Sequence, residues 1–226
     1  MENKLIGFVV AMEKEARLLL NNCESVEEIS QSTKRIYRGR LQNKNFVLII
    51  AGIGKVNSAM STQLLLDNYS PSLLINFGVA GGKKGSGLNA GDIVQIKEAC
   101  QYDFDLSELD NVNIGYMQDY NLTYYPLSIC ENLSKNYKLV KCASGDRFTS
   151  KKLYLDIIKN LGAEVVDMEC GAIAQVALAN NIPLHSIKLI SDVDGKEESV
   201  YSQYANNVET ICNKIPNTIE DLIKNI

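Results

Sequence analysis

Short, continuous runs of apolar residues alternate with segments of helical periodicity along most of the chain. An uninterrupted apolar run of this kind is typical of a strand that is buried on both faces of a sheet. A repeat of three to four residues is typical of a helix that covers such a sheet. We therefore expect strands at 5–10, 35–41, 45–50, 73–77, 91–96, 139–143 and 184–190.

Helical segments separate these strands. We expect helices at 11–20, 56–68 and 150–161, an Ala-rich helix that follows residue 169 and ends at residue 179, and one or two helices within 200–226. Residues 101–138 follow neither pattern and are rich in Asp, Asn and Tyr, so we expect a functional or mobile loop there. The pattern predicts one α/β domain over residues 1–226 with a mainly parallel sheet.

Composition narrows the class of protein. With 46% hydrophobic and 22% charged residues, the chain has the balance of an ordinary soluble protein. A net charge of −4 gives no electrostatic reason to expect a nucleic-acid or membrane partner. The six cysteines form no CxxC pair and His185 is the lone histidine, so we expect no metal and no cofactor. Signal-peptide and membrane-spanning patterns are absent from the sequence, so we expect a cytoplasmic protein.

Two glycine-rich segments follow predicted strands. Residues 52–55, Gly-Ile-Gly-Lys, lack the GxxxxGK[ST] spacing of a phosphate-binding P-loop, so we expect a tight strand-to-helix turn. Residues 78–82, Gly-Val-Ala-Gly-Gly, are expected to form a loop, either a plain turn or one whose backbone amides approach a ligand.

Three carboxylates follow apolar runs. Glu15 comes after the strand at 5–10, Glu169 comes after the apolar pair Val165-Val166, and Asp192 comes after the strand at 184–190. Because ligand sites in α/β folds collect at the carboxyl ends of strands, a functional interpretation puts all three around one pocket. The structural interpretation is that Glu15 and Glu169 open helices and that Asp192 caps one. The three residues alone leave both interpretations open.

The last predicted strand carries one further charged residue. Lys188 has the same parity as Asp192, so in a regular strand both side chains would face the same way. His185 has the opposite parity and is expected to pack in the core.

Seven short motifs occur in a fixed order. They are Ala-Met-Glu-x-Glu (11–15), Gly-Ile-Gly-Lys-Val (52–56), Asn-x-Gly-x-Ala-Gly-Gly (76–82), Gly-Asp-Ile-Val (91–94), Ser-Gly-Asp-x-Phe (144–148), Asp-Met-Glu (167–169) and Ile-Ser-Asp-Val (190–193). Together they resemble the 5′-methylthioadenosine/S-adenosylhomocysteine nucleosidases of the nucleoside phosphorylase superfamily. The resemblance covers nearly the whole chain and is weakest across 101–138. It implies a three-layer α/β/α sandwich around a central mixed, partly barrel-like sheet, and a homodimer.

The resemblance also implies a reaction. The N-glycosidic bond of methylthioadenosine or adenosylhomocysteine would be hydrolysed to adenine and a thio-substituted ribose, with nucleoside and water as the small-molecule partners. Breaking this bond forms an oxocarbenium-like sugar and a poor leaving group, so an acid must protonate the base. By resemblance, Asp192 protonates adenine with Ser191 beside it, Glu15 activates water, and Glu169 with the Met168 backbone binds the ribose hydroxyls.

The remaining expected contacts also come from the resemblance. Phe148 would stack on adenine and the Thr149 backbone would read its edge. Met12 and Ile53 would wall the sugar and thioalkyl end, with Ala80 and Gly81 along the floor. Val79, Asp167 and Lys188 complete the expected substrate-binding set. Two of these depart from the family, which usually has Ser in place of Val79 and Arg in place of Lys188, and Lys lacks the planar fork of Arg.

Three alternatives stay open at this point. A phosphorylase of the same superfamily would need several basic side chains for phosphate, whereas Met12-Glu13-Lys14-Glu15 would repel it. A hydrolase of another nucleoside, of the futalosine type, is barely separated by sequence because most contacts to the base come from backbone. A non-catalytic nucleoside-binding protein would not need Glu15, Glu169 and Asp192 together.

Overall fold

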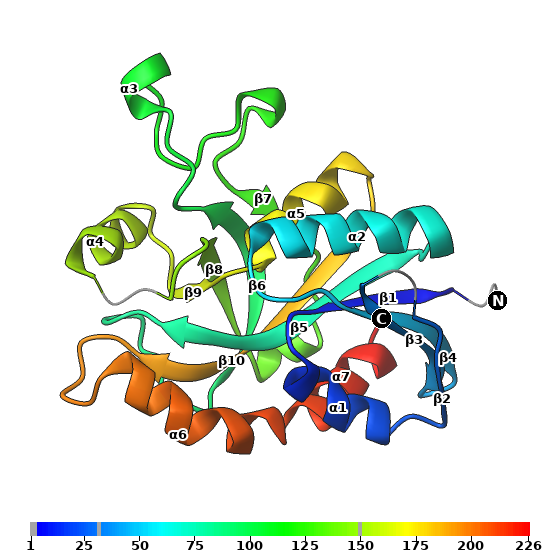
Figure 1. Ribbon diagram of the computed structural model, residues 1–226. Coiled ribbons are helices and arrows are strands. Elements are labelled where there is room, and N and C mark those ends of the chain that lie inside the picture. The colour runs from blue at the N-terminus through cyan, green and yellow to red at the C-terminus, as the bar shows by residue number, and fades with distance from the viewer. Residues whose placement is uncertain (1–3, 31–32, 149–150) are drawn as a thin grey trace.

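The computed structural model describes residues 4–30, 33–148 and 151–226, and its helices and strands alternate as expected (Figure 1). The strands are β1 Ile6–Val10, β2 Ser25–Glu28, β3 Arg35–Leu41, β4 Lys44–Ile50, β5 Leu73–Gly82, β6 Ile93–Gln101, β7 Tyr125–Pro126, β8 Lys138–Ser144, β9 Val165–Asp167 and β10 Leu184–Val193. The helices are α1 Glu13–Asn21, α2 Lys55–Tyr69, α3 Ser107–Asp110, α4 Lys152–Asn160, α5 Cys170–Ala179, α6 Val200–Cys212 and α7 Ile215–Lys224, with single 3₁₀ turns at Gln118–Tyr120 and Leu133–Lys135.

The strands form one mixed sheet that closes on itself at one end. Their order is β10-β6-β8-β9-β5-β1-β4-β3-β2, and β10 also pairs with β5, so β5, β10, β6, β8 and β9 make a closed ring. Pairs β5–β10, β6–β8 and β1–β4 are parallel, whereas β6–β10, β5–β9 and β3–β4 are antiparallel. The expected partly barrel-like fold is therefore confirmed, and the sheet is mixed rather than mainly parallel.

Helices cover both faces of this sheet (Figure 1). One core joins Val9 and Ile49 to α2 and α5. A second core joins Phe8 and Val10 to α1, α6 and α7 on the other face. Successive residues of β1 thus enter different cores, which explains why its apolar run is continuous.

Several predicted boundaries differ from the structure. Strand β6 runs on to Gln101, where sequence analysis ended it at residue 96, and the short strands β7 and β9 were not predicted. The expected loop at 78–82 is the end of β5, because those residues pair with β10 and β9. Strand β10 continues to Val193, where sequence analysis ended it at residue 190. Strand β2 was missed because its four residues, Ser-Val-Glu-Glu, are exposed and largely polar. The turn between β3 and β4 contains only Gln42 and Asn43, both with positive φ, and Lys44 belongs to β4.

Residues 101–138 are the least regular part, as expected. Apart from the last residue of β6 and the first residue of β8, they hold the short helix α3, the two-residue β7 and two 3₁₀ turns. Residues 105–124 form an excursion that projects away from the sheet, at the top of Figure 1. Among the described residues, no helix is both long enough and apolar enough to cross a membrane.

Candidate active site

One hollow of about 130 Å³ lies near the carboxyl ends of β1, β5 and β10. Ligand sites in α/β folds collect at these strand ends. The lining residues are Ala11, Met12, Glu15, Ile53, Val79, Ala80, Gly81, Arg147, Phe148, Val166, Asp167, Met168, Glu169, Ser191, Asp192 and Tyr204. Twelve of the fourteen site residues expected from sequence are in this set; Lys188 is not, and Thr149 lies outside the described residues.

Glu15 points into the hollow from the first turn of α1. Its two carboxylate oxygens accept hydrogen bonds from the backbone amides of Met12, at 2.9 Å, and Val79, at 3.0 Å. Burial raises the pKa of Glu15, and the two amide hydrogen bonds and Lys188 oppose that rise. Glu15 therefore faces the hollow as a buried, oriented carboxyl whose proton affinity is above normal.

Glu169 directly precedes α5 but does not cap it. Its Oε1 accepts from the Gly54 amide, at 3.0 Å, across the hollow. The capping role belongs to Asp167, whose Oδ2 accepts from the Cys170 amide at 3.0 Å. Burial, together with the negative charge of Asp167, raises the pKa of Glu169 to about 7. Glu169 therefore opens α5, as the structural interpretation expected, but its side chain makes no capping hydrogen bond and faces the hollow.

Asp192 lies inside β10, so it caps no helix. The pairing of β10 with β5 shifts register between Ile190 and Asp192, which marks an irregularity at Ser191. Asp192 Oδ1 accepts from the Ser191 hydroxyl at 2.6 Å. Burial raises the pKa of Asp192, and the nearby charge of Asp194 adds to the rise. A raised pKa is what an acid catalyst needs near neutral pH.

Glycines of β5 leave room for two of these carboxylates. A Cβ at Gly78 would come within 2.6 Å of Glu15 Oε1, and one at Gly81 within 3.0 Å of Asp192 Oδ2. No real Cβ tolerates the first distance without a shift of the carboxylate. Residues 78–82, which were expected to form a loop, are thus the end of a strand, and its glycines leave space for the acidic side chains.

Lys188 is buried beneath the hollow and does not line it. Its Nζ pairs with Asp167 Oδ2 at 2.7 Å, and both side chains are almost inaccessible. Although burial alone would raise the pKa of Asp167, Lys188 and the Ser144 hydroxyl, at 2.5 Å, lower it. The negative charge of Asp167 raises the pKa of Lys188, although burial alone would lower it. Alternation along the strand predicts that Lys188 and Asp192 face the same way. In the structure the Lys188 ammonium forms an ion pair with Asp167.

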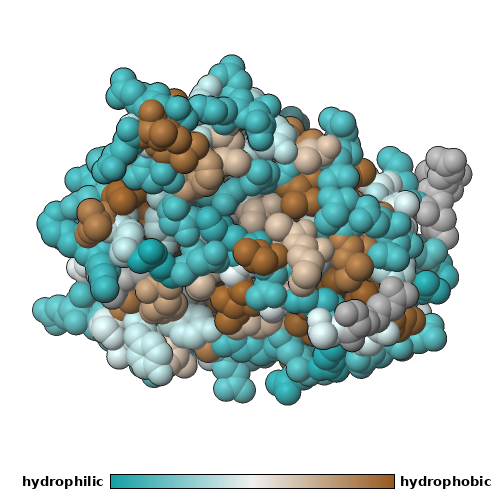
Figure 2. Space-filling view, turned by 45° about the horizontal axis from the view of Figure 1, so that its top comes forward, coloured by the Kyte–Doolittle hydropathy of each residue, from teal (hydrophilic) through white to brown (hydrophobic). Residues whose placement is uncertain are grey.

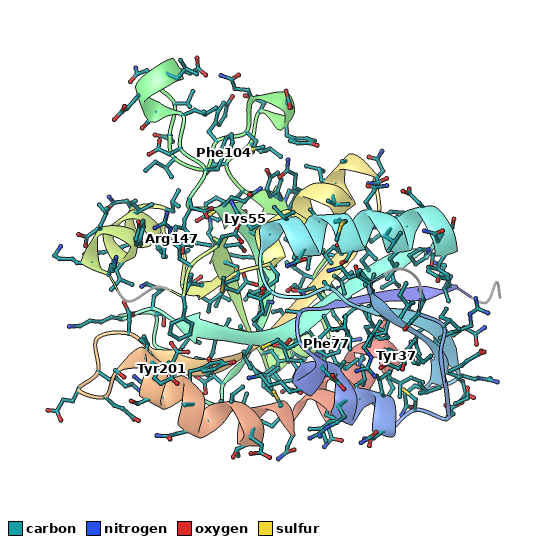
Figure 3. All side chains as sticks on the ribbon, viewed as in Figure 1. Tyr37, Lys55, Phe77, Phe104, Arg147 and Tyr201 are labelled. Atoms are coloured by element: carbon teal, nitrogen blue, oxygen red, sulfur yellow. The ribbon has the colours of Figure 1, made fainter. Side chains whose placement is uncertain are left out.

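The hollow also contains residues that sequence analysis missed. Tyr204 of α6 packs edge-on against Phe148, with ring centroids 5.7 Å apart, and its hydroxyl lies 3.9 Å from Met12 Sδ. Arg147 comes from the loop after β8 and lies on the α4 side of Lys55 in Figure 3. Ala11 and Val166 complete the wall. No motif identifies Tyr204, because it reaches the site only through the packing of α6 on the sheet.

Cys142, Asp167 and Cys170 place their ligand atoms within 4.8 Å of one another, as a metal site does. However, Asp167 already accepts from Lys188, Ser144 and the Cys170 amide. A cation there would also lie beside the Lys188 ammonium. The chemistry of this group therefore suits a hydrogen-bonded support under the hollow better than a metal site. His185, as expected, packs in the interior, with Nδ1 unpaired among the described residues.

Comparison with known proteins gives the same architecture. A curated relative, the 5′-methylthioadenosine/S-adenosylhomocysteine nucleosidase of Oceanobacillus iheyensis, is 35% identical over 204 residues, which cover 86% of this chain and 89% of that protein. The crystal structure of such a nucleosidase from Colwellia psychrerythraea 34H, in complex with adenine, matches with a TM-score of 0.87 at 26% identity, over 99% of this chain and 96% of that chain.

A third similarity is one of fold alone. Futalosine hydrolase of Helicobacter pylori strain 26695 matches with a TM-score of 0.90 at 23% identity, over 99% of each chain. Backbone shape therefore does not separate these hydrolases from one another. Residues 5–224 match the phosphorylase superfamily. The chain belongs to the phosphorylase superfamily and, within it, to the family of 5′-methylthioadenosine/S-adenosylhomocysteine nucleosidases.

Proposed function

We propose that this protein hydrolyses the N-glycosidic bond of 5′-methylthioadenosine and S-adenosylhomocysteine, releasing adenine and the thio-substituted ribose. The observation that carries the proposal is the meeting of Glu15, Glu169 and Asp192 around one hollow, each with a pKa raised by burial. Groups with perturbed pKa values that converge in one pocket are characteristic of catalytic sites.

Asp192 acts as the general acid. Its proton is transferred to N7 of adenine while the bond between N9 and the ribose breaks, so the base leaves as neutral adenine. The Ser191 hydroxyl bonds Oδ1, which leaves Oδ2, beside Gly81, to carry the proton. The raised pKa of Asp192 keeps this proton available at higher pH than an exposed aspartate would.

Glu15 activates water. The amides of Met12 and Val79 fix the carboxylate, so one oxygen can accept a proton from a water that attacks C1′ of the ribose. The ribosyl cation is intercepted by that water, and the proton removed by Glu15 returns to solvent. Glu169, oriented by the Gly54 amide, accepts hydrogen bonds from the ribose hydroxyls, while Met12, Ile53, Phe148 and Met168 supply the apolar contacts.

Hydrolysis is favoured over phosphorolysis by the charge around the hollow. Lys188, the basic residue expected in the substrate-binding set, is 2% exposed and paired with Asp167. Val79 has no hydroxyl that would hold a phosphate oxygen. Arg147 lines the hollow and its guanidinium bonds the Tyr154 hydroxyl, and the carboxylates of Glu15 and Glu169 on the same lining would repel a dianion when ionised.

The test is release of free base from a panel of nucleosides, with and without phosphate. The panel contains methylthioadenosine, adenosylhomocysteine, adenosine and a futalosine-type compound. We expect adenine from the first two at rates that do not depend on phosphate. Strict dependence on phosphate would instead indicate a phosphorylase, and cleavage of the futalosine-type compound alone would indicate the related hydrolase. Binding without release of any base would indicate a non-catalytic nucleoside-binding protein.

The same proposal includes the setting in which the enzyme acts. We propose a cytoplasmic homodimer formed by the single domain of residues 1–226. Apolar side chains show between polar ones on the face that carries α2 (Figure 2). Ile53, Val56 and Met60, spaced three and four residues apart at the start of α2, are at least half exposed. Apolar patches rimmed by polar groups often mark protein interfaces. Light scattering on the purified chain tests the dimer, and a monomer at micromolar concentration would contradict it.

A further inference from the structure

Lys55, the last residue of the Gly-Ile-Gly-Lys turn, has no part in the proposed reaction. It is the first residue of α2, and its Nζ bonds Asp103 Oδ1 at 2.6 Å. The two side chains are only 17% and 15% exposed. Asp103 follows the end of β6, so this ion pair joins the start of α2 to the base of the excursion. In Figure 3 Lys55 lies below Phe104 and to the right of Arg147, beneath that excursion.

A third segment joins the same pair. Asp103 Oδ2 accepts from the Asp146 amide at 2.9 Å, and Asp146 Oδ1 accepts from the Lys55 amide at 2.7 Å. Lys55, Asp103 and Asp146 therefore form a closed ring of hydrogen bonds across three loops. Gly54 has a φ of 100°, and a Cβ there would lie 2.9 Å from Asp146 Oδ1, so the glycine is required by this ring as well as by the turn.

Two of the linked segments carry residues that line the hollow. Ile53 is two residues before Lys55, and Phe148 is two residues after Asp146. The Gly54 amide, immediately before Lys55, donates to Glu169 Oε1. The position of these loops therefore decides both the apolar contacts to the base and the orientation of the carboxylate that faces the sugar.

The charges make Lys55 the essential member of the ring. Its ammonium is the cation that pairs with Asp103, which is mostly removed from solvent, while its backbone amide bonds Asp146. Without the ammonium, the Asp103 carboxylate would lose its counter-ion and would be less firmly held in position to accept from the Asp146 amide. Resting on the proposed function, we infer that Lys55 is a positioning residue: through Asp103 and Asp146 it holds the 53–54 turn and the 146–148 loop at the separation that nucleoside binding requires.

The test compares steady-state constants for adenine release from methylthioadenosine. Lys55→Met keeps the aliphatic stem and removes the charge, and we expect KM to rise about 10-fold while kcat changes less than about 3-fold, because loss of a charge-assisted hydrogen bond is felt equally in ground and transition states. Lys55→Arg restores the cation and is expected to recover most of the lost affinity. Asp103→Asn should raise KM in the same direction, and the double variant should be no worse than Lys55→Met.

Lys141→Met is the matched control. Lys141 pairs with Glu98 at 2.7 Å and also joins the β6 and β8 regions, but neither residue lines the hollow. We expect its KM to stay within about 2-fold of the wild type. An equal rise of KM in Lys55→Met and Lys141→Met would overturn the inference, because it would reflect general loosening of the sheet.

Calorimetric titration with adenine separates this inference from the proposed function. We expect Lys55→Met to weaken adenine binding by the same factor as it raises KM. Unchanged adenine affinity and unchanged KM in that variant would overturn the inference while leaving the function intact. A wild-type protein that releases no adenine from any nucleoside would overturn the proposed function, and the adenine titration would then decide the positioning role alone.

Discussion

Two aspartates of this protein each accept a hydrogen bond from a serine hydroxyl, at almost the same distance, and they behave in opposite ways. Ser144 donates to Asp167 at 2.5 Å beneath the hollow, and Ser191 donates to Asp192 at 2.6 Å in its wall. The pKa of Asp167 is lowered, whereas that of Asp192 is raised. A serine partner and burial are therefore not what separates a supporting carboxylate from a reactive one.

The remaining neighbours make the difference. Asp167 also accepts from the Cys170 amide and from Lys188, so its negative charge is fully compensated. Asp192 has Ser191 as its one hydrogen-bond donor among the described residues, and it lies near a second acid, Asp194. A carboxylate compensated by a cation stays ionised and supports the fold. A desolvated carboxylate with one neutral donor has a raised pKa, which is the property that the proposed general acid requires.

The largest expected effect comes from Asp192→Asn. Loss of the general acid should lower kcat for methylthioadenosine about 10³-fold, within the range for removal of an acid catalyst. Adenine affinity should change little, because the amide occupies the same space. Stopped assays of adenine release and calorimetry measure the two quantities. Turnover within 10-fold of the wild type would refute the acid assignment.

Lys188→Met tests the other aspartate. The substitution leaves Asp167 as a buried charge without its cation, and removal of one partner of such a pair costs about 3–5 kcal/mol of unfolding free energy. Adding Asp167→Asn to Lys188→Met should recover part of that loss, because the stranded charge disappears. Urea unfolding of the three proteins gives the comparison. A loss below 1 kcal/mol in Lys188→Met would mean that the pair does not control stability.

The pH dependence of stability extends the comparison to Glu169, a third buried carboxyl whose pKa is raised. Its folded pKa of about 7 lies above the unfolded value of 4.5, so its contribution to stability is present in full below pH 4.5 and is lost as pH rises through 7. The upper limit of that loss is about 3 kcal/mol. Glu169→Gln cannot ionise, so its advantage over the unliganded wild type should grow from pH 4.5 to 7 and then level off. Urea unfolding at a series of pH values checks this, and parallel curves would contradict it.

The smallest effects are expected from the two serines. Ser144→Ala removes a donor to Asp167 and the acceptor of the Gly171 amide, so we expect a loss of about 1–3 kcal/mol in unfolding free energy with kcat unchanged. Ser191→Ala should instead lower kcat about 3- to 10-fold with little loss of stability. Thermal unfolding and adenine release are measured on both variants. Equal changes in stability and in kcat for the two variants would remove the distinction between the two aspartates.

Sequence reasoning located β1, β5 and β10, because buried strands have an uninterrupted apolar signature, but it missed the three-residue strand β9 that carries Asp167. It also brought Glu15, Glu169 and Asp192 into one pocket on the rule that ligands bind beyond strand ends, although their catalytic roles stay predictions. It misjudged residues 78–82, because glycines that extend a strand beside bulky carboxylates look like glycines that form a loop.

Other features depend on distant parts of the chain and have no local signal. The pairing of Lys188 with Asp167 requires β9 and β10 to lie in the same closed ring, which alternation along β10 alone cannot reveal. Tyr204 reaches the hollow because α6 packs on β5 and β10, and its neighbours in sequence give no indication of this. Local patterns therefore identified the elements, and the three-dimensional closure of the sheet decided which charges met.

The closed ring also has a consequence for how the chain becomes active during folding. Strand β10 fills the gap between β5 and β6, and it pairs Leu184 with Leu74 across more than a hundred intervening residues. Contacts between such distant segments form slowly, because the chain must first lose the entropy of closing a long loop. Since Asp192 and Ser191 enter the hollow only with β10, a refolding chain has no complete set of reactive groups before this last strand docks. Recovery of catalysis should therefore lag behind recovery of helix signal, and its time course reports the moment at which the ring shuts.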